Sequence, residues 1–209
     1  MMKILFFGDS ITDAGRDYQS DISENALGFG YVAKVSKSLA DKTDYQIINR
    51  GISGNRVVDL YARIKCDVWN LEPDVLTIYI GVNDLWHELA GKNGVDVERF
   101  EKVYRMLIED TKKRLPNVKM MLISPYVIKG EATKDQWSMW AELKDYEAVV
   151  EKLAKEYGIC YLALQPVFDE NVTKDGEQTY SLDGVHPEEA GVKLIANEWL
   201  KAFKNNIEK

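Results

Sequence analysis

The chain has 209 residues, of which 45% are hydrophobic and 29% charged, a balance typical of a globular protein with a buried core. The net charge of −7 at pH 7 argues against nucleic acid or an anionic membrane as the main partner. No stretch approaches the roughly 18 consecutive apolar residues that indicate a membrane span. The length and the lack of a linker predict a single domain over residues 1–209.

Short apolar runs alternate along the chain with longer segments of helical spacing. In chain order we expect a strand at 4–7, a helix at 29–41, a strand at 45–48, a helix at 56–69, a strand at 75–80, a helix at 96–115, a strand at 119–123, a helix at 140–157, a strand at 160–162 and a helix at 187–205. This alternation predicts an α/β protein with a parallel sheet covered by helices on both faces.

Local signals mark the start of the last helix and one long loop. Pro187 suits the first helical position, and Glu188 and Glu189 favour the positive end of the helix dipole. Residues 125–138 show the least regular pattern, so we expect a long loop after the fourth strand.

Cysteine usage and the first residues predict a cytoplasmic protein. Cys66 and Cys160 lack metal-ligand spacing, and we interpret both as buried or half-buried thiols. The apolar run at residues 4–7 ends at Gly8 and is too short for the core of a signal peptide. A cytoplasmic location follows, unless a leader has been removed.

Four polar segments lie where strands end or where the last helix begins. Residues 8–10 follow the first expected strand, 49–55 the second and 81–84 the third, while 183–186 precede the last helix. In open α/β sheets, ligands bind beyond the carboxyl ends of the strands. We therefore expect these four distant segments to converge on one site.

Ser10, Asp183 and His186 supply a nucleophile, an orienting acid and a base, the three parts of serine-based acyl transfer. The chain has only two histidines, and Asp183 lies three residues before this one, which favours the catalytic interpretation. The alternatives are that Ser10 only caps a helix and that His186 is a polar residue at a helix start. The other histidine, His87, follows Trp86, and we expect it on the surface or at the rim of the site.

Gly54 and Asn83 are candidate donors to a developing oxyanion. A glycine lets its backbone N–H face the oxyanion with no side chain in the way, and the Asn83 amide can donate a further hydrogen bond. Each residue could instead serve only a turn. We interpret Asp9 and Asp84 as carboxylates that hold the local backbone. No histidine cluster accompanies these carboxylates, so neither a metal nor a cofactor is expected.

At these residues the chain resembles the SGNH hydrolases, a branch of the GDSL esterases and lipases. The four residues that name this family are matched in order by Ser10, Gly54, Asn83 and His186, whereas the G-x-S-x-G elbow of common α/β-hydrolases is absent. The resemblance implies a flavodoxin-like three-layer α/β/α sandwich with a central five-stranded parallel sheet. It also implies an oxyanion hole formed by the backbone N–H groups of Ser10 and Gly54 and the side chain of Asn83.

A narrower similarity, to intracellular bacterial acetylxylan esterases, is carried by residues 8–13, 30–33, 51–55 and 83–86. It implies a serine esterase for acetyl groups on xylo-oligosaccharides or related carbohydrates. The alternatives are a lysophospholipase or thioesterase of the same superfamily and, from another class, a non-catalytic carbohydrate-binding protein. The polar stretch 16–25 offers no apolar lid of the kind that a lipase needs, which favours a short acyl group.

Aromatic side chains near the expected mouth could pack against sugar rings or simply fill the core: Tyr18, Phe29, Tyr31, Trp86, Tyr126, Trp137 and Trp140. Trp86 and Tyr126, together with Asp9, are the candidate substrate contacts. Exposed aromatics and methionine are enriched at interfaces, so the segment with Trp137, Met139 and Trp140 is a candidate interface for a homo-oligomer.

Overall fold

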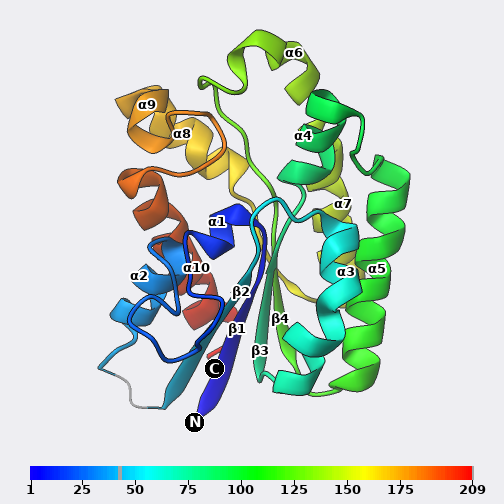
Figure 1. The fold of residues 1–209 in the computed structure, drawn as a ribbon, viewed down its shortest axis with the longest axis vertical. Helices are drawn as coiled ribbons and strands as arrows, with labels where there is room; N and C mark the ends of the chain where they lie inside the picture. The colour runs from blue at the N-terminus through cyan, green and yellow to red at the C-terminus, as the bar shows by residue number, and fades with distance from the viewer. Residues whose placement is uncertain (42–43, 209) are drawn as a thin grey trace.

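A central sheet of five parallel strands organises the residues that the computed structural model describes, 1–41 and 44–208 (Figure 1). The strands are β1 (Met2–Gly8), β2 (Tyr45–Gly51), β3 (Val75–Tyr79), β4 (Lys119–Ile123) and β5 (Cys160–Leu162). Their order in the sheet is β2-β1-β3-β4-β5, and every neighbouring pair is parallel. This is the flavodoxin-like order, so the expected sheet is confirmed.

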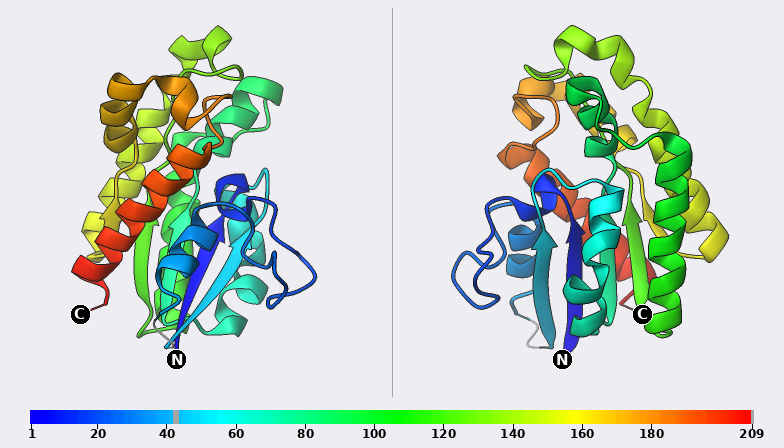
Figure 2. Two further views of the ribbon diagram at one scale, coloured as in Figure 1. Left: turned by 90° about the vertical axis from the view of Figure 1, so that its left-hand side faces the viewer. Right: turned by 45° about the vertical axis from the view of Figure 1, so that its right-hand side comes forward.

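Helices cover both faces of the sheet, as expected (Figure 1, Figure 2). On one face, α2 packs against α10. On the other face, α3 packs against α5, and α5 against α7. The bounds of these helices are Tyr31–Ser38 for α2, Val57–Asp67 for α3, Val97–Arg114 for α5, Leu143–Tyr157 for α7 and Glu189–Asn206 for α10. The three layers place the carboxyl ends of the strands at one edge of the molecule.

Further helices, which the sequence did not predict, lie near this edge. They are α1 (Ser10–Asp13), α4 (Val82–Gly91), α6 (Trp137–Trp140), α8 (Gln165–Asp175) and α9 (Glu177–Tyr180), and 3₁₀ turns span Trp69–Leu71 and Lys134–Gln136. The expected loop 125–138 therefore contains a 3₁₀ turn and the start of α6, which lies at the top of Figure 1. In α8 the only buried residue is Phe168, so its sequence has no clear apolar stripe.

Several boundaries and exposures also differ from the expectation. Glu188 is the N-cap of α10, so Pro187 lies before the helix and not at its first position. Cys66 is exposed, which corrects its interpretation as a buried or half-buried thiol, whereas Cys160 is half-buried as expected.

Within residues 1–41 and 44–208, no helix has both the length and the apolar character to cross a membrane.

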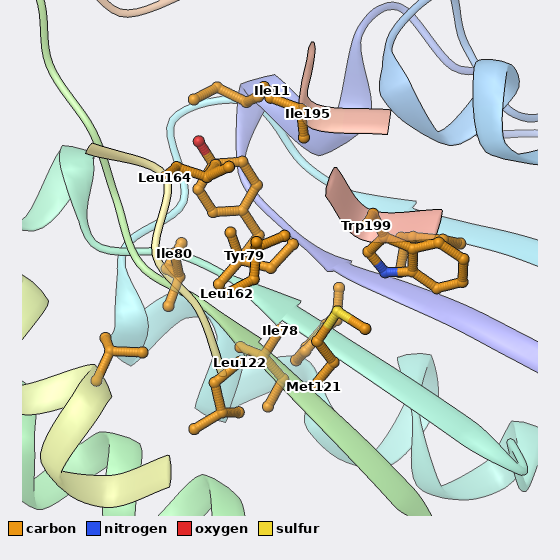
Figure 3. Close-up of a cluster of buried hydrophobic side chains, with 14 of the residues drawn as sticks. Ile11, Ile78, Tyr79, Ile80, Met121, Leu122, Leu162, Leu164, Ile195 and Trp199 are labelled. Carbon is orange, nitrogen blue, oxygen red and sulfur yellow. The ribbon is translucent and has the colours of Figure 1, made fainter. Parts of the chain in front are cut away.

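The hydrophobic core follows the central strands. All residues of β3 are buried, as expected for a parallel strand with helices on both faces. Figure 3 shows Ile78 and Tyr79 of β3 in one buried cluster with Met121 of β4 and Trp199 of α10. The Trp199 indole N–H donates to Thr77 Oγ1 at 3.0 Å, so this polar pair is satisfied inside the core. The packing fixes the strand ends from which the site is built.

Candidate active site

Ser10 is the first residue of α1, just beyond the end of β1. Asp9 is the N-cap of this helix, because its Oδ1 accepts the Ile11 N–H at 3.0 Å. The alternative that Ser10 only caps a helix is therefore wrong. Instead, Ser10 Oγ lies 2.8 Å from His186 Nε2, within hydrogen-bond distance.

Asp183 holds both the backbone and the ring of the residue three positions later. Its Oδ2 lies 2.6 Å from His186 Nδ1, and its Oδ1 accepts the backbone N–H groups of Val185 and His186 at 2.8 Å each. The Ser181 hydroxyl also donates to Oδ1, at 3.0 Å. The imidazole is thus oriented with Nδ1 toward the carboxylate and Nε2 toward Ser10, which is the geometry that serine-based acyl transfer requires.

The Asp183–His186 contact also sets the charges of the pair. Burial alone would raise the pKa of Asp183, but hydrogen bonds from the His186 ring and from the backbone N–H groups of Val185 and His186 hold that pKa far below its ordinary value. The same hydrogen bond raises the pKa of His186, against the opposing effect of partial burial. The acid is therefore ionised at neutral pH, and the imidazole is a stronger base than a free histidine.

Gly54 and Asn83 line one open pocket of about 510 Å³ together with Ser10 and His186. Gly54 has a φ of +79°, a left-handed conformation that favours glycine. The Asn83 side chain is only 4% exposed, and its amide donates to the Asn55 carbonyl at 3.0 Å. A primary amide has two N–H groups, so one is left for a ligand in the pocket.

The helix α4 supplies the remaining wall of this pocket with Trp86, His87 and Ala90. The Trp86 ring centroid lies 5.9 Å from that of His186, so this tryptophan reaches the site as expected. His87 lines the pocket too, which agrees with its expected place at the rim. Partial burial, followed by the charge of Arg56, lowers the pKa of His87, so it is neutral at neutral pH.

Asp9 and Tyr126 do not reach the pocket, which corrects their expected role as substrate contacts. Both side chains are 0% exposed. Asp9 holds the turn before α1, as its alternative interpretation predicted. The Tyr126 hydroxyl donates to the Val185 carbonyl at 2.9 Å, and its ring stacks on Phe168 with centroids 3.7 Å apart. Tyr126 therefore supports the loop that carries His186 from behind.

Asp13 holds the segment that carries Gly54, and the sequence analysis missed it. Its side chain is 3% exposed, and its Oδ2 accepts the Ser53 backbone N–H at 3.0 Å and the Ser53 hydroxyl at 2.6 Å. The Tyr18 hydroxyl donates to the same oxygen. Asp13 stands three residues after Ser10, on the single turn of α1, but no sequence pattern links it to Ser53.

Asp84 plays the structural role that the sequence predicted. It is 0% exposed, and its two carboxyl oxygens accept the Val57 N–H at 3.0 and 3.2 Å, which ties the start of α3 to α4. Among the residues that the structure describes, no group of three or more His, Cys, Asp or Glu side chains could hold a metal ion.

The chain belongs to the GDSL-like lipase/acylhydrolase family, whose family model matches residues 6–194. It is 35% identical over 207 residues to an acetylxylan esterase from Geobacillus stearothermophilus, covering 95% of this chain and 92% of that protein. The structure of a variant of an acetyl xylan esterase from Geobacillus stearothermophilus matches with a TM-score of 0.88 at 33% identity, covering 100% of this chain and 97% of that chain. LAE5, an α/β hydrolase enzyme from the metagenome of Lake Arreo in Spain, also gives a TM-score of 0.88 at 33% identity, covering 97% and 95%.

Family membership and these similarities identify the class of reaction. The chain is a carboxylic-ester hydrolase. The alternative of a non-catalytic carbohydrate-binding protein is therefore wrong.

Proposed function

We propose that this chain is a serine esterase that removes acetyl groups from xylo-oligosaccharides or related carbohydrates. The observation that carries the proposal is the continuous series of contacts from Asp183 Oδ2 to His186, at 2.6 Å, and from His186 to Ser10 Oγ, at 2.8 Å. This series ends at an open pocket, where an ester can approach Ser10. The similarity in sequence and in structure to acetylxylan esterase from Geobacillus stearothermophilus supports an acetyl group on a carbohydrate.

In the first step, Ser10 Oγ attacks the ester carbonyl while His186 Nε2 takes the hydroxyl proton. Asp183 keeps the ring oriented and stabilises the imidazolium that forms. The carbonyl oxygen becomes an oxyanion, which accepts hydrogen bonds from the backbone N–H groups of Ser10 and Gly54 and from the Asn83 amide. His186 then protonates the leaving sugar hydroxyl, and acetyl-Ser10 remains.

In the second step, a water molecule attacks acetyl-Ser10 and gives its proton to His186 Nε2. The same oxyanion donors stabilise the second tetrahedral intermediate, and its collapse releases acetate and returns the proton to Ser10 Oγ. The raised pKa of His186 suits it to both tasks, because it accepts a proton in one half of each step and donates it in the other.

Location, domain organisation and assembly remain predictions. We propose a single domain over residues 1–209 and a cytoplasmic location. A homo-oligomer formed through the segment around α6 also stays a proposal. Met139 is 45% exposed and could take part in such a contact, whereas Trp140 is 2% exposed and already packs inside the chain.

The test compares the wild type with Ser10→Ala on acetylated xylo-oligosaccharides, 4-nitrophenyl acetate and 4-nitrophenyl octanoate. We expect acetate release from the sugars by the wild type and a loss on the order of 10⁴–10⁶ in kcat for Ser10→Ala, because members of a triad act as a unit. Ser53→Ala is the matched control, since Ser53 lines the same pocket. It should stay within about tenfold of the wild type, as only one hydrogen bond is removed.

The substrate panel separates the alternatives within the family. Turnover of 4-nitrophenyl acetate without acetate release from the sugars would contradict the carbohydrate substrate. A much faster octanoate rate would favour a lysophospholipase or a thioesterase.

A further inference from the structure

A second hollow, of about 270 Å³, lies beside α6 where α7 and α8 begin. We call it the α6 hollow. Figure 1 shows α6 at the top of the molecule and α8 in its upper part, beyond the carboxyl ends of the strands. The hollow is lined by Val127, Trp137, Trp140, Ala141, Leu143, Lys144, Glu147 and Gln165. Its wall thus combines two indole rings with a few polar groups, the usual composition of a small-molecule site.

Two ring contacts connect the α6 hollow with the catalytic residues. The Trp140 ring, on the wall of the hollow, packs edge to face on Trp86, with centroids 5.9 Å apart. The Trp86 ring in turn lies 5.9 Å from the ring of His186. The Trp86 and Trp140 rings therefore separate the two pockets, which lie close enough for one oligosaccharide to reach both.

Trp140 lies on the wall of the hollow, and most of its side chain is buried. The side chain is 2% exposed, and its indole N–H is buried without a hydrogen-bond partner among the described residues. Because this N–H is buried, Trp140 contributes the apolar surface of its ring to the wall of the hollow.

Trp137 and Glu147 offer a ring and a carboxyl to the same ligand. The Trp137 side chain is half-buried, and Lys129 lies 5.6 Å from its ring centroid, which helps to fix the ring. Glu147 is also half-buried, and burial, followed by the charge of Asp169, raises its pKa to about 7. Near neutral pH the Glu147 carboxyl is therefore often protonated, and it can then both donate to and accept from a hydroxyl group.

Gln165, in contrast, is already engaged. Its Oε1 accepts the Val127 N–H at 2.9 Å, and its Nε2 donates to the Val127 carbonyl at 3.0 Å and to Asp169 at 2.8 Å. These bonds hold Gln165 in place and leave the polar contacts with a ligand to Glu147 and Lys144. A carboxyl beside an ammonium group suits a neutral ligand with hydroxyl groups better than an anion.

We propose that the α6 hollow is a second sugar-binding subsite, which holds another ring of the oligosaccharide whose acetyl group lies at Ser10. This inference rests on the proposed function. Trp137 packs against the apolar face of the sugar ring, while Glu147 and Lys144 bond its hydroxyl groups. The volume lies below the roughly 300–1,000 Å³ of sites for drug-sized ligands, which suits one ring rather than a longer chain.

The kinetic test uses Trp137→Ala and Glu147→Gln, with Met139→Ala as the matched control on the same helix as Trp137. Met139 is exposed and does not line the hollow. For each variant, kcat/KM on acetylated xylo-oligosaccharides is divided by kcat/KM on 4-nitrophenyl acetate, which is too short to reach both pockets. We expect this ratio to fall about tenfold for Trp137→Ala and about threefold for Glu147→Gln, and to stay constant for Met139→Ala. A constant ratio in all three variants would overturn the subsite.

A binding measurement separates the subsite from the proposed reaction. Xylotriose is titrated into full-length Ser10→Ala and into Ser10→Ala/Trp137→Ala, and the heat of binding is followed. Saturable binding that weakens about tenfold in the double variant supports the subsite, even if the wild type releases no acetate from sugars and the proposed substrate is wrong. Equal binding to both variants, or no binding, overturns the subsite whatever the esterase activity is.

Discussion

On the Ser10 side of the pocket, contacts between distant parts of the sequence hold the serine in place, whereas on the His186 side the contacts that orient the ring span only a few residues. Asp13 binds Ser53, and the Asn49 amide donates to the Thr12 carbonyl at 2.7 Å. Asp183, in contrast, orients His186 from three residues away.

Burial differs in the same direction. Asp13 is buried, while Asp183 is half-buried and His186 is exposed. The comparison teaches that local geometry within one loop orients the ring of His186, the proposed base, whereas the tertiary fold places Ser10 and the proposed oxyanion donors. Substitutions on the two sides should therefore differ in their effects on kcat, on the pH profile and on stability.

The largest effect after loss of Ser10 is expected from Asp183→Asn. The amide would keep the size of the side chain but not its charge, so kcat should fall by about 10³–10⁴. Asp183 raises the pKa of His186, and only the neutral imidazole is a base, so wild-type activity should rise with pH through this raised pKa. In Asp183→Asn the rise should move to lower pH. A pH–rate profile measures both the fall in kcat and the pH at which activity rises. A profile that does not move would contradict the effect of Asp183 on the pKa of His186.

A smaller loss is expected from Asn83→Ala on the opposite side of the pocket. Removal of one oxyanion donor should reduce kcat by about 10²–10³ with little change in KM, because the donor acts mainly on the transition state. Steady-state kinetics on 4-nitrophenyl acetate are sufficient for this test. An unchanged kcat would remove Asn83 from the oxyanion hole.

Asp13→Asn tests whether the tertiary contacts of the Ser10 side serve catalysis. The amide cannot accept all the hydrogen bonds that the carboxylate accepts, so the segment with Ser53 and Gly54 should shift, and kcat should fall roughly 10- to 100-fold. Tyr18→Phe is the control, because it removes one donor to Asp13 and leaves Ser53 bound. If Asp13→Asn lowers only the melting temperature and leaves kcat intact, Asp13 has a purely structural role.

Asp9→Asn should have the smallest effect on activity and a clear effect on stability. Burial raises the pKa of Asp9 to about 7, from an ordinary value of 3.8. The folded chain therefore keeps a proton that the unfolded chain loses, so this group makes the free energy of unfolding fall as pH rises from about 4 to 7. Urea unfolding at several pH values should show a smaller fall for Asp9→Asn. An equal fall in both proteins would contradict a protonated Asp9.

The same contrast explains what could be predicted from the sequence. Asp183 and His186 are three residues apart, so their contact follows from local spacing. The parallel sheet follows from the alternation of strands and helices, and its strand order from the resemblance to the SGNH hydrolases. Asp13 could not be assigned, because its partner Ser53 is forty residues away and lies near only in the folded chain. Tyr126 was expected at the mouth for its aromatic character, yet its hydroxyl has a buried acceptor in Val185. Burial of a polar aromatic residue depends on such tertiary partners, which no sequence pattern shows.

The most direct test of Ser10 as the nucleophile is covalent labelling with a fluorophosphonate, followed by mass spectrometry of the digested protein. The account predicts one adduct on the peptide that contains Ser10, absent in Ser10→Ala and retained in Ser53→Ala. An adduct on another residue, or labelling of Ser10→Ala at the wild-type rate, would contradict it.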